Sequence, residues 1–240
     1  MPRHGHPPMQ VLRALLQECE ETLLGYERMP PKLLLSRTKW SPDRIRDYCA
    51  VCGRDALNHG ADCAAADART VPFSHVTRLG SYQEPLSAWI REIKFARWGC
   101  MAQQLGRLLG RACRQSIERG DQSPRCVVPV PMPSLRKHLR GIDHAQLLAR
   151  EVARQTGLPL RRCVRQKHGP TQVSGPSGRR RRRPNPFRPA AWGKRAKGKN
   201  ILLVDDVLTS GSTARDVCRV LRSLGAREIS LAVLAVVDDR

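Results

Sequence analysis

The sequence has few aromatic residues, few acidic residues relative to its basic ones, and no long apolar run. Of 240 residues, 4% are Phe, Trp or Tyr, and 43 Lys and Arg stand against 21 Asp and Glu, giving a net charge of +22. The most apolar stretches, 201–204 and 231–237, are far shorter than the roughly 20 residues of a membrane-spanning helix. We therefore expect no membrane span. The charge favours a polyanionic partner such as nucleic acid, a phosphate-rich substrate or an acidic membrane surface, unless it only reflects a GC-rich genome.

We also expect neither a secretory leader nor a disulfide framework. Charged residues interrupt the apolar positions near the N-terminus, so no signal-peptide core forms. The nine cysteines are odd in number, and only Cys49, Cys52 and Cys63 cluster. A reduced, cytoplasmic protein is the expectation.

Composition and periodicity predict three parts. A helical extension and linker should occupy 1–44, with a helix at 10–25. Linker-like composition runs over 28–48 and so reaches into the next part, a short cysteine-bearing segment at 45–74. The main domain is then expected over 75–240.

Within the main domain, apolar spacing predicts two helices over 81–119, broken near Arg97-Trp98-Gly99, and a helix from Asp143 to Gln155. A strand is expected at Cys126, and a strand, helix and strand between 200 and 237 form a βαβ unit, which favours a parallel sheet. The basic segment 165–199, which contains Arg179 to Arg183, is expected to be a mobile loop or a ragged antiparallel segment.

The most informative motif is the turn inside the βαβ unit. An apolar strand ends in Asp205 and Asp206, and a run of small residues then leads into a helix: Thr209, Ser210, Gly211, Ser212 and Thr213. The free N–H groups, the helix dipole and the hydroxyls together form a cradle for an anion. The two carboxylates can accept hydrogen bonds from sugar hydroxyls or hold Mg²⁺. A simple helix cap would need only one hydroxyl residue and would not explain the two acids.

This turn resembles the 5-phosphoribosyl-1-pyrophosphate (PRPP) signature of type I phosphoribosyltransferases. The resemblance implies an α/β fold, a parallel sheet flanked by helices. It also implies that Asp205 and Asp206 hold the ribose hydroxyls and that residues 209–213 hold the 5′-phosphate. Hypoxanthine-type enzymes carry a further acid where this chain has Thr209, so their general-base mechanism is not implied.

Two further segments resemble the ComF (GntX-like) family of this superfamily: Val127-Val-Pro-Val-Pro-Met-Pro and Arg140-Gly-Ile-Asp-His-Ala-Gln-Leu-Leu-Ala. Ile93-Lys94-Phe95 is similar to that family's Leu-Lys-Tyr, and the resemblance covers roughly 45–240. It implies a pyrophosphate loop that follows the strand beginning at Cys126 and includes Pro131, Met132, Arg136, Lys137 and Arg140.

The resemblance implies a phosphoribosyltransferase-like protein that binds PRPP with Mg²⁺ and transfers the phosphoribosyl group to an unknown nucleophilic acceptor, with loss of pyrophosphate. The alternative is a non-catalytic ComF-type protein that binds single-stranded DNA during DNA uptake, with Arg179–Arg183 neutralising phosphates. The family's acceptor segment survives only loosely in Gln172, Asn185 and Phe187.

The cysteine cluster is half of a zinc knuckle, Cys49-Ala-Val-Cys52-Gly. Cys63 is present, but the position expected for its partner holds Ala66, so His59 is the candidate fourth ligand for Zn²⁺. His75 is a more distant candidate. A lost metal site, a redox thiol pair and coincidence remain open alternatives.

Overall fold

The computed structural model describes residues 29–57, 59, 72–96, 98–132, 142–167 and 185–238. The chain divides into two compact units, 1–40 and 41–240. In the first unit the described helix is α2 (Pro31–Arg37), where Pro31 suits the first helical turn because its missing N–H has no helical partner there. The linker predicted over 28–48 therefore contains a helix, and also a 3-10 turn, η1 (Ile45–Asp47). The helix predicted at 10–25 lies outside the described residues.

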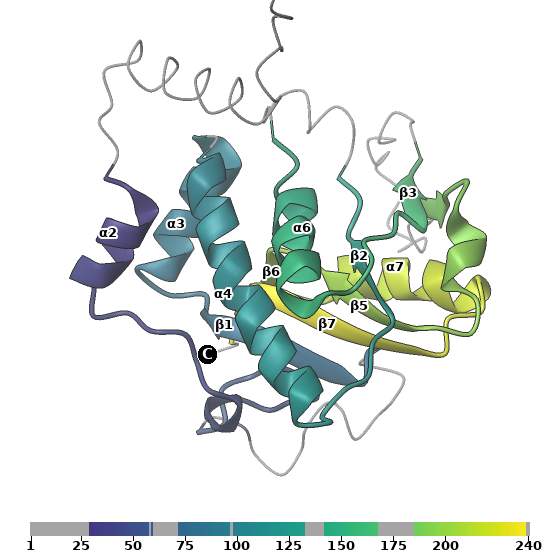
Figure 1. Ribbon diagram of the computed structural model, residues 1–240, viewed down its shortest axis with the longest axis horizontal. Coiled ribbons are helices and arrows are strands. Elements are labelled where there is room, and N and C mark those ends of the chain that lie inside the picture. Colours follow the sequence, from purple (N-terminus) through teal and green to yellow (C-terminus); the bar gives the residue numbers. More distant parts are fainter. Residues whose placement is uncertain are drawn as a thin grey trace, which may run out of the picture. The chain divides into compact units, whose positions relative to one another are not determined.

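A parallel sheet forms the centre of the second unit (Figure 1). Its strand order is β1-β7-β5-β2, and the short β6 also pairs with β7. The strands are β1 (His75–Ser81), β2 (Cys126–Pro129), β5 (Asn200–Val204), β6 (Val207–Leu208) and β7 (Glu228–Val236). The predicted parallel sheet is confirmed, and β1 is a strand that the sequence pattern did not predict.

Helices cover both faces of this sheet. Alternate residues of a strand face opposite sides, so Ile201 and Leu203 of β5 pack into the core cluster with Val217 and Leu221 of α7 (Ser212–Ser223). On the other face, α4 (Gly99–Glu118) and α6 (His144–Thr156) pack against the sheet and against each other (Figure 1).

The predicted helices agree with those observed. Two helices occupy the 81–119 segment, α3 (Leu86–Phe95) and α4, and they are separated near Trp98 as expected. The Asp143 side chain caps α6 by accepting the N–H of Gln146 at 3.1 Å, and Gly157 ends that helix in the left-handed conformation, with φ +71°. In the described part of the chain, no helix is both long and apolar enough to cross a bilayer.

A small antiparallel pair lies beside the main sheet. It consists of β3 (Val164–Gln166) and β4 (Phe187–Pro189), and the 3-10 helix η3 (Gly193–Ala196) then leads into β5. Of the two alternatives expected for 165–199, a mobile loop or a ragged antiparallel segment, an antiparallel pair is observed where the two ends of the stretch are described. Arg179–Arg183 and Gln172 lie outside the described residues.

Candidate functional site

The candidate site lies between the end of β5 and the start of β6, where pairing with β7 is interrupted. Both strands pair with β7, and Asp205 and Asp206 are the two residues between them. The Asp205 N–H donates to the carbonyl of Ala232 at 3.1 Å, while the Asp206 carbonyl accepts the N–H of Leu234 at 2.9 Å. The sheet therefore fixes the backbone of both acids at the carboxyl end of β5, where ligands of open α/β folds bind.

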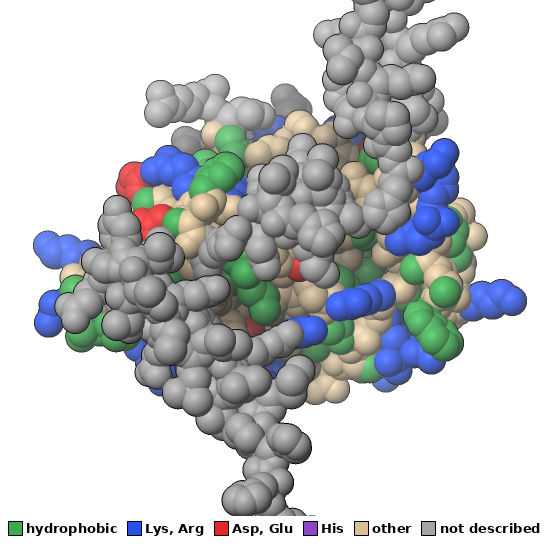
Figure 2. All heavy atoms as spheres, turned by 90° about the horizontal axis from the view of Figure 1, so that it is seen from above, with side chains coloured by type: hydrophobic (Ala, Val, Ile, Leu, Met, Phe, Trp, Pro, Cys, Tyr) green, Lys and Arg blue, Asp and Glu red, His purple; other side chains and the backbone are tan. Residues whose placement is uncertain are grey.

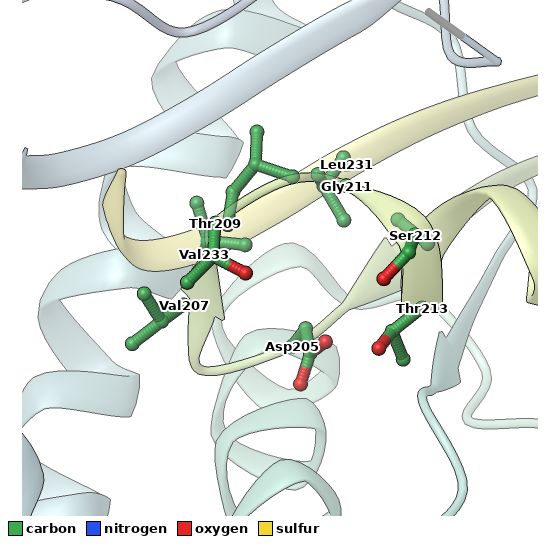
Figure 3. A pocket seen from close by; sticks show the side chains of 10 residues that line it. Asp205, Val207, Thr209, Gly211, Ser212, Thr213, Leu231 and Val233 are labelled. Atoms are coloured by element: carbon green, nitrogen blue, oxygen red, sulfur yellow. The ribbon is translucent and has the colours of Figure 1, made fainter. Parts of the chain in front are cut away.

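Asp205 faces a small, open pocket, which the turn and the start of α7 line. Figure 3 shows its carboxylate on the side toward which the hydroxyls of Ser212 and Thr213 point. Burial raises the pKa of Asp205 well above its usual value, and the neighbouring Asp206 carboxylate raises it further. A cation or hydroxyl donors in the pocket would stabilise the ionised form of Asp205 and lower this pKa.

Asp206 faces away from that pocket, toward α3 and α6. Its Oδ2 lies 2.9 Å from Nζ of Lys94 and 3.0 Å from Nε2 of His144. Burial by itself would raise the pKa of Asp206, but the His144 hydrogen bond and the Lys94 charge outweigh it and hold that pKa well below its usual value. Asp206 is therefore a buried carboxylate with protein partners.

The turn after β6 has the geometry of an anion cradle. Gly211 is the N-cap of α7 with φ +70°, a backbone conformation that side chains with a Cβ resist. Thr209, Ser210, Ser212 and Thr213 are exposed around it. Nη2 of Arg215 donates to the carbonyl of Ser210 at 2.7 Å, so a guanidinium also lies against the turn. Free N–H groups of the first helical turn, hydroxyls and a cation suit a phosphate.

Only part of the expected pyrophosphate loop can be placed. Val130 donates its N–H to the carbonyl of Val204 at 2.9 Å, so Pro131 and Met132 leave the sheet beside the end of β5. Arg136, Lys137 and Arg140 lie outside the described residues. The described part of this segment is thus adjacent to Asp205 along the edge of the sheet.

The residues of the loosely matched acceptor segment have structural contacts. Nδ2 of Asn185 donates to the carbonyl of Asp216 on α7 at 2.8 Å, and its Oδ1 accepts the N–H of Phe187. The Phe187 ring is buried in the core cluster. These two side chains attach β4 to α7.

The cysteine cluster forms a second candidate site. The ligand atoms of Cys49, Cys52 and His59 all lie within 4.8 Å of one another, and Sγ of Cys52 is 3.0 Å from a ring nitrogen of His59. Two thiols and an imidazole at these separations fit the tetrahedral coordination of Zn²⁺. Cys63 lies outside the described residues. His75 is not in the cluster, and its Nε2 contacts the Ser116 hydroxyl at 3.1 Å.

An internal arginine holds the segment that bears this cluster. Arg78 of β1 is 1% exposed and donates to the carbonyl of Gly53 at 2.8 Å, one residue after Cys52. The same guanidinium pairs with Asp43 at 2.9 Å and with Asp238 at 3.0 Å. Its contacts therefore join the cysteine segment to the first and last strands of the sheet.

Sequence reasoning missed three residues around the turn: Lys94, His144 and Arg215. Lys94 and His144 lay inside motifs quoted for family resemblance, but no role was assigned to them. The signal for Arg215 was local, since it lies one helical turn after Gly211. For the other two, only the packing of α3 and α6 shows which acid they meet.

The chain matches the Phosphoribosyl transferase domain family over residues 102–240. It is 33% identical over 192 residues to Competence protein F of Haemophilus influenzae, covering 78% of this chain and 84% of that protein. It is 26% identical over 195 residues to DNA utilization protein YhgH of Escherichia coli strain K12, covering 78% and 82%. A 37-residue stretch, 15% of this chain and 20% of the relative, is 51% identical to adenine phosphoribosyltransferase of Kineococcus radiotolerans.

Solved structures of phosphoribosyltransferases are also similar. Purine phosphoribosyltransferase from Pyrococcus horikoshii matches with a TM-score of 0.32 and 18% identity, over 53% of this chain and 70% of that one. Glutamine PRPP amidotransferase from B. subtilis matches with a TM-score of 0.36 and 20% identity over 54% of this chain, which spans only 25% of that larger protein. With the match over 102–240 and the extended similarity to Competence protein F, this chain belongs to the phosphoribosyltransferase family, in its ComF-like branch.

Proposed function

We propose that the protein binds PRPP at the 205–213 turn and transfers its phosphoribosyl group to a nucleophilic acceptor, releasing pyrophosphate. The observation that carries this proposal is the pocket in which one carboxylate, Asp205, faces a hydroxyl-rich helix N-terminus. A 5-phosphorylated sugar has the matching chemistry, with a phosphate for the cradle and hydroxyls for the carboxylate.

In this proposal the residues divide the ligand between them. The N–H groups at the start of α7, with the hydroxyls of Thr209, Ser210, Ser212 and Thr213, bind the 5′-phosphate. Asp205 accepts hydrogen bonds from the ribose hydroxyls, and the Pro131–Met132 segment, with Arg136, Lys137 and Arg140, adjoins the pyrophosphate. Since cations stabilise a leaving pyrophosphate, those three basic residues would lower the barrier to its departure.

The chemical step is a substitution at C1 of the ribose. The bond from C1 to the pyrophosphate oxygen breaks, the acceptor forms a new bond to C1 with inversion, and positive charge develops on the ring as in glycoside cleavage. Oxygen ligands such as the Asp205 carboxylate fit Mg²⁺, which when bound would offset charge on the departing pyrophosphate. Loss of the acceptor's proton needs a base, and among the described residues that line the pocket Asp205 is the one ionisable side chain.

Calorimetry with PRPP tests this function directly. Titration of the full chain with PRPP and Mg²⁺ should give saturable heat, and Asp205→Asn should abolish it. Asp216→Asn is the matched control. Asp216 lies on α7, whose N-terminus forms the anion cradle, but its carboxylate pairs with Arg219 at 2.6 Å. Absence of heat in the wild-type protein, with and without Mg²⁺, would refute PRPP binding. Release of pyrophosphate upon addition of candidate acceptors then tests transfer.

A second candidate function is binding of single-stranded DNA. It is favoured by a stretch of the chain that has many basic residues and no acidic ones. Between Glu151 and Asp205 the sequence contains no acid but 15 Lys and Arg. Figure 2 shows Lys and Arg side chains gathered on the side of the molecule where Figure 1 places β3 and the residues after it. Among the described residues, no ion pair involves the cations of 185–199. The names of the relatives, a competence protein and a DNA utilization protein, are consistent with this candidate.

An exposed aromatic residue lies on that basic surface. Trp192 is 61% exposed, and the Arg195 guanidinium lies 4.5 Å from its ring centroid. Stacking of a base on such a ring is worth about 1–3 kcal/mol, so Trp192→Ala should weaken oligonucleotide binding about tenfold. Arg114→Ala, on α4, is the control. Binding that is independent of salt, or unaffected by both Trp192→Ala and Arg195→Ala, would exclude this surface.

A further inference from the structure

We propose that a metal ion held by Cys49, Cys52 and His59 stabilises the anion cradle at 209–213, so that the metal and PRPP favour each other's binding. The inference rests on the proposed function for the identity of the ligand. It also uses the fit of the two thiols and the imidazole to Zn²⁺. The cluster thereby acquires a role in ligand binding, although its three residues do not line the pocket.

The first step is the attachment of the cysteine turn, 49–53, to the edge strand β1. The Val76 N–H of β1 donates to the carbonyl of Ala50, which lies between the two cysteines, at 2.7 Å. Nη1 of Arg78, also on β1, donates to the carbonyl of Gly53 at 2.8 Å. Two backbone carbonyls of the turn thus accept from β1, so the candidate metal ligands and the first strand are joined.

The second step is a close contact between the cysteine turn and β7. Gly53 has φ +78°, and a Cβ added there would lie 2.8 Å from Cγ1 of Val76 and 3.1 Å from Cγ2 of Val236. These two valines are 0% and 2% exposed. Because side chains in a close-packed interior have little room to shift, the Gly53 backbone supports both β1 and the last residue of β7. The position of the cysteine turn therefore affects the end of β7.

The third step leads from β7 to the cradle. Val236 pairs in register with Leu208 of β6, and the N–H of Val237 donates to the Leu208 carbonyl at 2.9 Å. Leu208 is the residue directly before the cradle. In the described part of the chain β6 is two residues long and pairs with β7 alone. Leu208 and Val236 also share one apolar cluster with Ala214, the residue directly after the cradle. The cradle is thus supported on both sides by residues that pack with the end of β7.

The direction of the coupling follows from these contacts. Without a shared metal, the cysteine turn keeps its backbone hydrogen bonds but loses the link between its thiols and His59, so it opens more readily. Loss of the contact with Val236 then loosens the end of β7 and with it β6. Phosphate binding needs the N–H groups of the cradle to be held in place. A ligand that binds the ordered cradle therefore favours the metal-bound protein, and the metal favours the ligand by the same factor.

Amide hydrogen exchange tests the structural part of the inference without any ligand. Removal of zinc with a chelator should raise exchange about tenfold in peptides that cover 206–215 and 234–237, and leave the peptide 144–156 of α6 unchanged. A full chain that binds no zinc would overturn the inference. Exchange at 206–215 that does not respond to zinc, or an equal response in α6, would also overturn it. This readout needs no PRPP, so it is decisive even if the proposed function fails.

Calorimetry tests the coupling itself. Affinity for PRPP with Mg²⁺ should be about tenfold weaker in Cys49→Ser than in wild type, and saturating PRPP should strengthen zinc binding by the same factor. Cys100→Ser, outside the cluster, is the control and should bind PRPP as wild type does. Equal PRPP affinity with and without zinc would refute the coupling. If no form of the protein binds PRPP, the proposed function fails, and the exchange experiment decides the inference.

Gly53→Ala separates the contact with β7 from the metal. Its methyl group meets the two valines while the three metal ligands remain, so zinc content should stay near about one ion per chain. PRPP affinity should nevertheless fall about fivefold, at the low end of such couplings. Gly120→Ala is the matched control, with φ +79° and nothing within 4 Å of an added Cβ. Wild-type PRPP affinity and wild-type exchange at 206–215 in Gly53→Ala would overturn the inference.

Discussion

Nη1 of Arg78 lies 3.0 Å from the carboxylate of Asp238, a residue 160 positions later in the chain. The guanidinium also pairs with Asp43, and it is 1% exposed. A buried cation with two carboxylate partners cannot be removed without leaving buried negative charge. The pair thus joins β1 to the end of β7 at a site that allows few substitutions.

We expect Arg78→Met to destabilise the protein by about 3–5 kcal/mol, because both acids lose their partner. Urea denaturation followed by circular dichroism measures this. Arg91→Ala is the control: its side chain is 55% exposed, and loss of its ion pair should cost less than about 1 kcal/mol. If the two variants unfolded at the same urea concentration, Arg78 would not stabilise this junction.

Gly211→Ala should lower both stability and ligand binding. Its φ of +70° makes any Cβ unfavourable, by about 1 kcal/mol. Gly120 is the matched control, with φ +79° and nothing within 4 Å of an added Cβ. Gly120→Ala should cost about as much stability and leave PRPP affinity unchanged. An equal loss of affinity in both variants would show that only general destabilisation was measured.

The cysteine cluster predicts zinc. Protein purified without chelators should contain about one zinc ion per chain by elemental analysis, and Cys49→Ser or His59→Ala should remove most of it. Cys100→Ser, a half-buried cysteine outside the cluster, should leave the zinc content unchanged. Cys63→Ser tests the predicted fourth ligand. Metal-free protein of normal stability would refute a zinc site.

Stability should fall in mild acid because of His75. Burial lowers the pKa of His75 below its usual 6.5, and the Arg119 charge adds to this although Asp121 opposes it. The folded state therefore favours the neutral ring. Above about pH 6.5 the ring is neutral in both states and costs no stability. Below that value the free energy of unfolding falls, because the unfolded chain binds the proton more readily.

Chemical denaturation at pH 7.5 and pH 5.5 measures this dependence. His75→Asn should show a smaller difference between the two pH values than wild type. An unchanged difference would mean that other groups cause the loss of stability in acid.

The sequence was most informative where local pattern and tertiary structure agree. The helix from His144 has its cap at Asp143 and its stop at Gly157, both within the segment itself. The strand, turn and helix around Asp205 likewise follow from neighbouring residues, because an apolar run, two acids and a glycine with positive φ all act locally.

The elements that depend on distant partners were harder to predict. The β1 strand contains His75, Thr77 and Arg78, which are polar, yet all three are buried. Their partners come from elsewhere: Ser116 for His75, and Asp43 and Asp238 for Arg78. Without those partners, a polar segment gives no sign that it lies inside a sheet.

The two acids of the turn show the same limit. That adjacent strand residues face opposite sides could be stated from the sequence. Which side holds the ligand pocket, and which holds Lys94 and His144, depends on how α3 and α6 pack. The sequence alone therefore does not show that the two acids have different surroundings.

The position of β7 affects how the protein can be made. It pairs with β1, β5 and β6, and it follows every other described strand in the chain. The ribosome therefore releases this central strand after the other described strands, and until then β1 and β5 each have an unpaired edge. N-terminal segments of many proteins fold while synthesis continues, but this sheet cannot assemble before residues 228–236 emerge. A premature stop before residue 228 would remove β7 and with it the pairing partner of β1, β5 and β6.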